Sequence, residues 1–300
     1  MLHGQNIFSF PPVMTDLFRM TDVDDVQLDS IRFLFPCFYL SFGMQDEMNL
    51  WNGGFFVDGA YVDASLWESG LLSVILSTRR KDVDYKKMNF ILERDRYFYF
   101  PLMFDTPGTT VGQAIDVAVQ KEQPFRPHDV PDTSGLYSVG DRNVIVIDRG
   151  KLTQVEVARE NSEGFPTFRA ALRLIVNGIC YLSSEKPDIE YKYPDETPRT
   201  WIEILEQSTR KADIKRAKQA LNSLGIYSKI HFCGESIRVE YEGLPTGREL
   251  SPHWRRGHWR NQAHGEGLSL RKLIWIKPTL VRRDKGEPEK GHIYQIEPSD

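Results

Sequence analysis

The sequence has few cysteines and no long apolar run. Cys37, Cys180 and Cys233 are its three cysteines, an odd number at wide spacing, which argues against a set of disulfides and favours a reducing compartment. A run of about 18 apolar residues, which a transmembrane helix needs, is also missing. The first twelve residues have neither the basic nor the apolar segment of a secretory signal. We therefore expect a cytoplasmic protein with no membrane partner.

The signatures of common enzyme classes are absent as well. The chain has no G-x-x-x-x-G-K-[ST], G-x-G-x-x-G or G-x-S-x-G stretch. These patterns would have indicated a phosphate-binding loop, a dinucleotide-binding fold and a serine nucleophile at a tight turn. We therefore predict no catalytic residue, no cofactor and no bound metal, and a protein that is not an enzyme.

What the sequence does have is a composition suited to a large core. Hydrophobic residues make up 40% and aromatic residues 12% of the 300 positions, as is typical of globular proteins. Aromatic and β-branched runs predict strands, with a hairpin turn at Asp58-Gly59, over residues 31–42, 53–64, 71–77, 97–104, 143–148, 226–241, 271–281 and 292–296. Apolar residues at helical spacing predict three helices, over residues 109–120, 165–182 and 202–224.

Local signals mark the ends of these helices. A threonine caps the first helix, Pro166 occupies the first turn of the second, and Gly225 ends the third. The order of elements predicts an α+β fold. We expect a mixed, largely antiparallel sheet in the N-terminal half, helices packed on it and a short β C-terminal segment.

Composition divides the chain into three regions, which form either separate units or one compact unit. They are a β-rich N-terminal region (1–125), a helical or mixed region (126–250) and a basic, aromatic C-terminal segment (251–300). Charge is distributed unevenly among them. Residues 1–68 contain ten acidic and two basic residues, whereas residues 248–283 contain nine basic and two acidic ones. Either the C-terminal end has an anionic partner, or the two ends attract each other.

One stretch, S-P-H-W-R-R-G-H-W-R-N-Q-A-H-G-E-G (251–267), differs from the rest of the chain. Arginine makes bidentate contacts with phosphate or carboxylate, and tryptophan beside arginine is typical of interfaces and of surfaces that stack on unpaired bases. The predicted partner-binding residues are His253, Trp254, Arg255, Arg256, His258, Trp259 and Arg260. The alternative is structural: the tryptophans anchor the segment to the core, and the arginines pair with the acidic N-terminal residues.

The same stretch contains three histidines within twelve residues. His253, His258 and His264 would be the ligands if the protein were a metal-dependent nuclease. Zinc sites use shorter spacings such as H-x3-H and often cysteine, and neither is found here. The nuclease is therefore the second alternative for function.

Two segments resemble the type V-A anti-CRISPR family of mobile elements. The first is the apolar helix followed by P-D-I-x-Y-K (187–192). The second is P-H-W-R-R-G-H-W (252–259) with the later residues Gly265, Gly267, Trp275 and Pro278. The resemblance covers about residues 165–192 and 250–281.

The resemblance implies a non-enzymatic inhibitor, carried by phages, plasmids and integrated elements, that acts in the cytoplasm of a bacterial host. The founding member lowers production of a single-protein, RNA-guided nuclease by recognising its emerging N-terminal part and causing loss of its mRNA. The implied partner is the nascent chain of a defence nuclease, its mRNA or the ribosome, so RNA binding is expected. The first alternative is an inhibitor that binds and blocks the defence protein directly through the aromatic N-terminal sheet.

Overall fold

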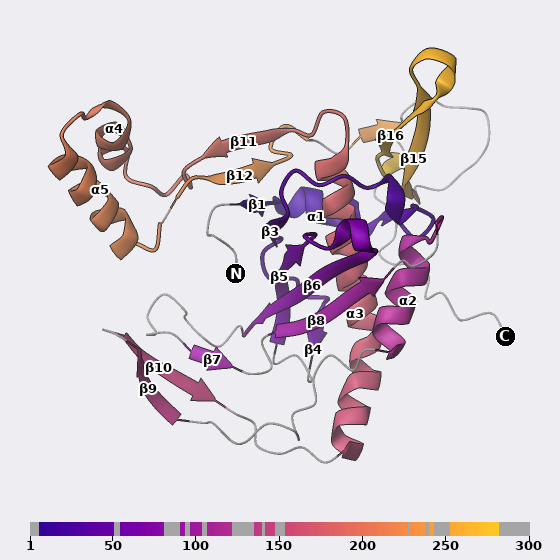
Figure 1. Cartoon of the computed structure of the whole chain (residues 1–300), viewed down its shortest axis with the longest axis horizontal. Coiled ribbons are helices and arrows are strands. Elements are labelled where there is room, and N and C mark those ends of the chain that lie inside the picture. Colours follow the sequence, from indigo (N-terminus) through magenta and orange to yellow (C-terminus); the bar gives the residue numbers. More distant parts are fainter. Residues whose placement is uncertain are drawn as a thin grey trace.

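The computed structural model describes most of the chain, with gaps. The described residues are 6–50, 55–80, 91–93, 97–103, 107–121, 135–139, 142–147, 154–226, 228–237, 240–242 and 253–281. The predicted strand at 292–296 lies outside them. Within them, helices and strands are mixed along the chain, which confirms the predicted α+β class (Figure 1).

A mixed sheet of eight strands forms the centre of the described fold (Figure 1). In spatial order its strands are β11 (Ile189–Lys192), β12 (Ile230–Cys233), β1 (Ile7–Ser9), β3 (Cys37–Ser41), β5 (Phe55–Asp63), β6 (Leu71–Arg79) and β8 (Tyr97–Met103), and β4 (Asn49–Leu50) pairs with β5. Strand β1 runs parallel to both of its neighbours, β3 and β12. The other pairings are antiparallel, so the prediction of a largely antiparallel sheet is confirmed.

Three short sheets complete the described strands. The first contains β7 (Ile91–Glu93), β10 (Arg142–Ile147) and β9 (Gly135–Val139), and the second contains β13 (Glu240–Glu242), β17 (Thr279–Val281) and β14 (His253–Arg255). The third contains β16 (Leu270–Ile276), β15 (Gly257–His264) and β2 (Thr21–Asp22). The described part of the C-terminal segment, residues 253–281, is thus built mainly of short strands, as predicted.

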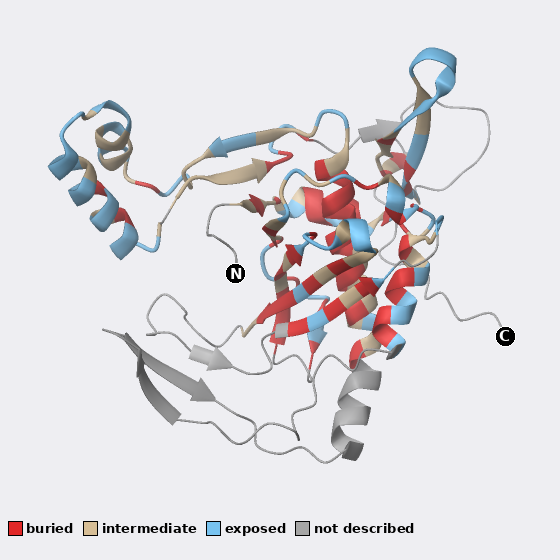
Figure 2. Ribbon diagram, in the orientation of Figure 1, coloured by how far each residue is buried: buried red, intermediate tan, exposed pale blue. Residues whose placement is uncertain are grey.

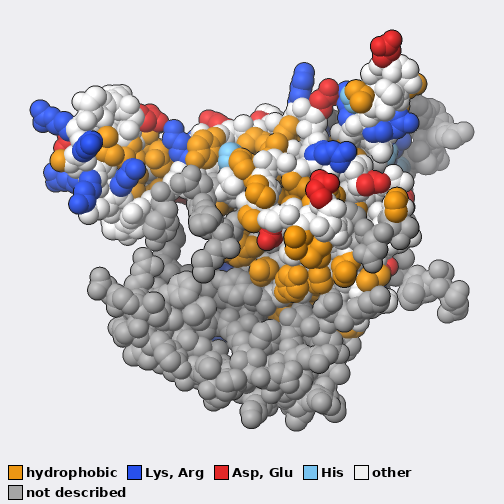
Figure 3. All heavy atoms as spheres, viewed as in Figure 1, with side chains coloured by type: hydrophobic (Ala, Val, Ile, Leu, Met, Phe, Trp, Pro, Cys, Tyr) orange, Lys and Arg blue, Asp and Glu red, His pale blue; other side chains and the backbone are white. Residues whose placement is uncertain are grey.

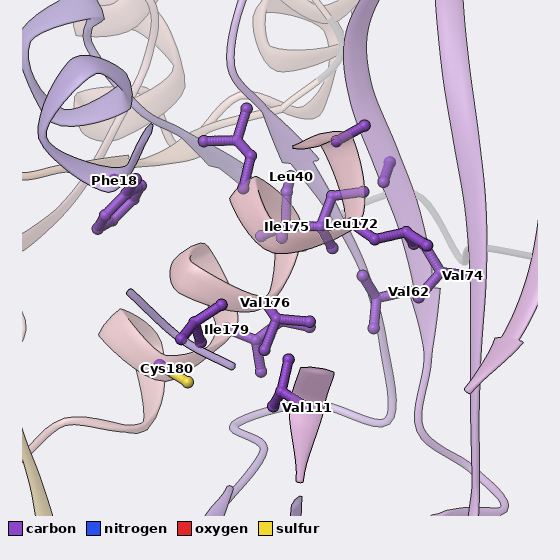
Figure 4. Close-up of a cluster of buried hydrophobic side chains, with 14 of the residues drawn as sticks. Phe18, Leu40, Val62, Val74, Val111, Leu172, Ile175, Val176, Ile179 and Cys180 are labelled. Atoms are coloured by element: carbon purple, nitrogen blue, oxygen red, sulfur yellow. The ribbon is translucent and has the colours of Figure 1, made fainter. Parts of the chain in front are cut away.

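Helix α3 (Gln154–Ser183) is the main helix packed on the sheet, close to α1 (Pro12–Arg19) and α2 (Val111–Lys121). Its apolar side chains recur at helical spacing and point toward the sheet (Figure 4); they are Leu172, Ile175, Val176 and Ile179. Gly178 allows the close approach, because a Cβ atom there would lie 3.2 Å from the ring of Phe42. Figure 2 shows the buried residues concentrated where α1, α3 and the sheet meet.

A reciprocal pair of hydrogen bonds begins α2. The Gln113 backbone N–H donates to Thr110 Oγ1 at 3.3 Å, and the Thr110 N–H donates to Gln113 Oε1 at 3.0 Å. This capping box satisfies two amides that the first turn leaves without partners. The predicted threonine cap is therefore confirmed. Among the described residues, short 3₁₀ helices also occur at Leu28–Ser30, Trp67–Ser69 and Glu266–Leu268.

The predicted hairpin turn at Asp58-Gly59 is wrong. Both residues lie inside β5, where the register with β6 shifts between Val57 and Gly59. A Cβ atom at position 59 would lie 2.3 Å from the Leu40 carbonyl oxygen and 2.4 Å from the Tyr39 hydroxyl. Glycine is present because the neighbouring strand approaches closely, and no turn is needed.

Two helix predictions need correction as well. The predicted helix at 202–224 is two helices, α4 (Arg199–Gln207) and α5 (Lys211–Ser223). Ser208 is extended and its hydroxyl accepts from the Arg210 N–H at 3.2 Å, which breaks the helical path. Gly225 does follow the second helix, with φ +79°. Pro166 lies inside α3 rather than in its first turn, because the helix begins twelve residues earlier.

One hydrophobic core extends from Phe8 to Leu273 and includes residues of the central sheet, α1, α2, α3 and β15–β16, but none of α4 or α5. The division into three regions stays a prediction. Among the described helices, none is both long enough and apolar enough to cross a membrane.

Candidate partner-binding surface

The predicted binding segment lies on β14 and β15, two strands that Arg256 connects and that belong to different sheets. Side chains alternate between solvent and interior along β14 and the first four residues of β15, as in a half-buried strand. The exposed residues are His253, Arg255, Arg256, His258 and Arg260. Trp254 is half-buried, whereas Gly257 and Trp259 are buried. Three arginines and two histidines therefore reach solvent along about eight residues of chain.

Trp259 is a core residue. Its side chain is 8% exposed, and its Nε1 donates a hydrogen bond of 2.7 Å to Asn177 Oδ1 on α3. Its ring stacks on that of Trp275 in β16, with centroids 5.9 Å apart and planes 16° apart. Trp259 thus anchors the segment to the core. The structural alternative given above is correct for this tryptophan, which was predicted to bind a partner.

Asn177 connects three parts of the fold. It is 1% exposed, and its Nδ2 lies within hydrogen-bonding distance of the carbonyl oxygens of Phe18 at 3.3 Å, Thr21 at 3.2 Å and Arg173 at 3.0 Å. Its Oδ1 accepts from Trp259, so both ends of the amide are used. A buried amide with satisfied partners fixes the orientation of everything it contacts. Asn177 therefore holds the C-terminal strands against α3 and the end of α1.

The acidic N-terminal stretch lies beside the basic segment. Strand β2 runs parallel to β15 and places Thr21 opposite Gly257 and Asp22 opposite His258. The contact is tight: a Cβ atom at Gly257 would lie 2.6 Å from Thr21 Oγ1. Asp24, however, pairs with Arg173 of α3 through hydrogen bonds of 2.5 and 2.8 Å. The acidic and basic segments are therefore neighbours, yet the charge of Asp24 is neutralised by Arg173 of α3 and not by the basic segment.

The three histidines are not brought together. His258 and His264 are six residues apart on β15, which corresponds to about 20 Å along a strand. His253 lies on a different strand, β14. In the described part of the chain, no group of three or more His, Cys, Asp or Glu side chains is close enough to hold a metal ion.

Sequence reasoning missed a second well-organised site, at the turn before β11. The Asp188 carboxylate accepts from the Ser236 N–H at 2.8 Å and from the Ser236 hydroxyl at 2.6 Å. These two hydrogen bonds lower the pKa of Asp188 below its ordinary value. The Tyr181 hydroxyl contacts the Asp188 backbone N–H at 2.8 Å and its carbonyl at 3.2 Å. The P-D-I stretch therefore fastens the base of strands β11 and β12 to the end of α3.

We expect Asp188→Asn to cost about 1 kcal/mol near neutral pH, a figure reduced because Asp188 is only partly buried. Since folding lowers the pKa of Asp188, its contribution is complete above the ordinary pKa and is lost as pH falls through the folded value. The stability gap between wild type and variant should therefore narrow from pH 6 to pH 3. Urea titrations at several pH values measure it. Glu203→Gln, on the exposed side of α4, is the control, and a gap that stays constant with pH would contradict the assignment.

Comparison with known proteins agrees with the sequence resemblance. Residues 8–283 match the model of the AcrVA2-like family, described as Anti-CRISPR type V subtype A2 family. A match over this length places the chain among the type V anti-CRISPR proteins. It belongs to the AcrVA2-like family of that type. The resemblance stated for residues 165–192 and 250–281 is therefore confirmed, and it extends through the N-terminal half.

Other comparisons add little. The crystal structure of AcrVA2 aligns with 92% of this chain and 71% of that chain, at 15% identity and a TM-score of 0.33. A TM-score this low supports no argument from the fold. No curated protein matches the chain. Family membership therefore rests on the sequence match.

Proposed function

We propose that the protein suppresses production of a CRISPR nuclease, or of another defence protein, by binding its nascent chain, the translating ribosome or the transcript. The observation that supports the proposal is the row of exposed arginines and histidines on β14 and β15. In this proposal the buried Trp259 anchors the contact surface to the core. The contact surface consists of His253, Trp254, Arg255, Arg256, His258 and Arg260.

The chemistry of the row suits an anionic partner. Arginine keeps its charge at every physiological pH and presents a planar fork of N–H donors to phosphate or carboxylate. Ribosomal RNA and mRNA are polyanions, and binding to them is dominated by such contacts. A β-strand fastened to the core through Trp259 presents these side chains on a rigid base, which reduces the entropy lost on binding.

Replacing three arginines tests the proposal. In cells that co-express a type V-A nuclease, we expect the wild-type protein to lower both the mRNA and the protein of the nuclease. The triple variant Arg255→Ala/Arg256→Ala/Arg260→Ala should restore both to about the level without inhibitor. Quantitative PCR and immunoblotting measure the two quantities together.

The matched control carries lysine at the same three positions. It keeps the charge and loses the bidentate fork. If the lysine variant still partly suppresses the nuclease, charge attraction to phosphate is sufficient; if suppression is lost completely, specific bidentate contacts are required. Thermal unfolding of both variants, compared with wild type, shows whether the substitutions also disturb the fold. If the alanine variant still lowers nuclease mRNA, the proposed surface is wrong.

A direct inhibitor is the second candidate, supported by a separate observation. Three large hydrophobic side chains are exposed on β6 and β8, namely Ile75, Tyr99 and Met103. Ile75 and Tyr99 lie directly opposite each other in the sheet. This patch would suit contact with a folded protein. In that case the nuclease would stay abundant while its activity fell, and Tyr99→Ser would restore the activity.

A further inference from the structure

A two-helix unit stands beyond the outer ends of β11 and β12, the last two strands at one edge of the central sheet (Figure 1). The chain runs along β11, forms α4 and α5, and returns along β12. We call residues 193–229 the helical arm. Within it, Ala217 and Leu221 of α5 are buried, and α5 packs against α4. The buried residues of α5 thus lie within the arm, the apolar residues of α4 are half-buried, and the outer side of α5 faces solvent (Figure 2).

The outer side of the helical arm is strongly basic. Blue side chains gather over α4 and α5 in Figure 3. Six cationic residues of the two helices and their connection are exposed; they are Arg199, Arg210, Lys211, Lys215, Arg216 and Lys218. Their side chains make no ion pair or hydrogen bond with any described residue. Elsewhere in the described chain, Arg19, Arg173, Lys192 and Lys272 all have acidic partners.

The acidic residues of the arm do not balance this charge. Residues 193–229 contain seven basic and five acidic residues. Of the acidic ones, Asp195 pairs with Lys192 at 3.5 Å and Glu206 with Lys229 at 3.0 Å, and only Asp213 lies on α5. Lys211 and Lys215 are four residues apart, and Lys215 and Lys218 are three apart. Such like-charged neighbours on a helix destabilise it by a few tenths of a kcal/mol per pair. The fold gains nothing visible from this arrangement, so a ligand is the better explanation.

We propose that the helical arm binds the phosphate backbone of a nucleic acid, through Lys211, Lys215 and Lys218 with Arg210 and Arg216 at the sides. The three lysines share one side of α5 and span about 10 Å along its axis. That length corresponds to about three nucleotides of rise along one strand. Because lysines contact phosphates as point charges and phosphates carry no sequence information, these contacts are independent of base sequence.

Other partners fit this surface less well. A helix that lies on a membrane needs an exposed apolar side to insert, and α5 has its buried residues turned toward α4. An acidic protein patch would offer a few fixed carboxylates, whereas here five cations lie within nine residues, 210–218, and reach different sides of the helix. The surface is also separate from β14 and β15, so the inference does not rest on the function proposed above.

The test is direct binding of the full-length protein to labelled 20-nucleotide single-stranded RNA, double-stranded RNA, single-stranded DNA and double-stranded DNA. Fluorescence anisotropy between 50 and 200 mM KCl gives the affinity and its salt dependence. We expect wild type to bind at least one of the four probes, and the probe bound most tightly identifies the type of nucleic acid. The triple variant Lys211→Gln/Lys215→Gln/Lys218→Gln should bind at least tenfold more weakly at 50 mM. Its salt slope should be smaller by about 2 on a single strand or about 3 on a duplex, because three phosphate contacts are removed.

Two comparisons make the result decisive. Glutamine preserves helix propensity, so circular dichroism of the triple variant should match wild type. The matched variant Glu203→Gln/Asp213→Asn removes negative charge from the same helices and should tighten binding. An unchanged salt slope in the lysine variant would overturn the proposal. So would loss of binding only in the β14–β15 arginine variant, or equal competition by polyglutamate, which would assign the arm to an acidic protein. Nuclease levels are not the readout, so this result is independent of the proposed suppression.

Discussion

Replacing Trp259 by alanine is expected to lower the free energy of unfolding by about 3–5 kcal/mol. The ring is buried and stacked on Trp275, so its removal leaves a large cavity beside α3. It also leaves Asn177 Oδ1 without its hydrogen-bond donor, and an unsatisfied buried acceptor adds to the cost. Chemical denaturation followed by circular dichroism measures the change.

Two variants separate packing from hydrogen bonding at this position. Trp259→Phe keeps most of the ring and loses the donor, so we expect a smaller cost of about 1–3 kcal/mol. Trp254→Ala, five residues earlier on the half-buried side of β14, should cost less than either. If Trp259→Ala proved as stable as wild type and only abolished suppression, Trp259 would be a contact residue, as the sequence pattern first indicated.

The second large effect is expected at Gly59, where alanine should destabilise the protein by about 3 kcal/mol. The added methyl group would meet the backbone carbonyl oxygen of Leu40 at 2.3 Å, and a backbone atom in the middle of a sheet cannot move aside. The Tyr39 hydroxyl, which bonds Ser77 Oγ at 2.9 Å, would also be displaced. Thermal unfolding of the variant measures the loss.

Gly43→Ala is the matched control for this substitution. Gly43 has φ +68° and nothing within 4 Å of a built Cβ, so alanine there costs only about 1–2 kcal/mol of backbone strain. Gly59 is not among the residues with positive φ, and its cost is steric. Equal destabilisation by the two variants would contradict the close approach of β3 and β5.

Elements that are specified by local sequence signals could be predicted from the sequence. The strands β6 and β8 and the helix α2 with its threonine cap lie where aromatic runs and apolar spacing predicted them. The hairpin turn predicted at Asp58-Gly59 was wrong because this pair of residues occurs both in tight turns and in strands that approach a neighbouring strand closely. Only the position of Tyr39, about twenty residues earlier, distinguishes the two.

For the candidate surface, the sequence predicted the segment and the structure shows how its residues divide. Alternation along β15 is visible in the letters G-H-W-R, yet the hydrogen-bond partner of Trp259 is Asn177, a polar residue among the buried apolar residues of α3. Nothing local to either residue indicates the pairing, since they are 82 positions apart. The helical arm was predicted as one helix over residues 202–224, and its separation from the core depends on how β11 and β12 pair.

The position of β1 has a consequence for synthesis of the protein. This strand lies near the beginning of the chain, and one of its two neighbours, β12, is formed by residues 230–233. Strand β2, in another sheet, likewise pairs with β15, which begins at residue 257. A ribosome adds about 5–20 residues per second, so one edge of β1 waits on the order of 10–50 s for its neighbour. Folding is therefore finished only when nearly the whole chain has emerged. A product that ended before residue 230 would carry an open strand edge into the cell, where it would pair with other chains.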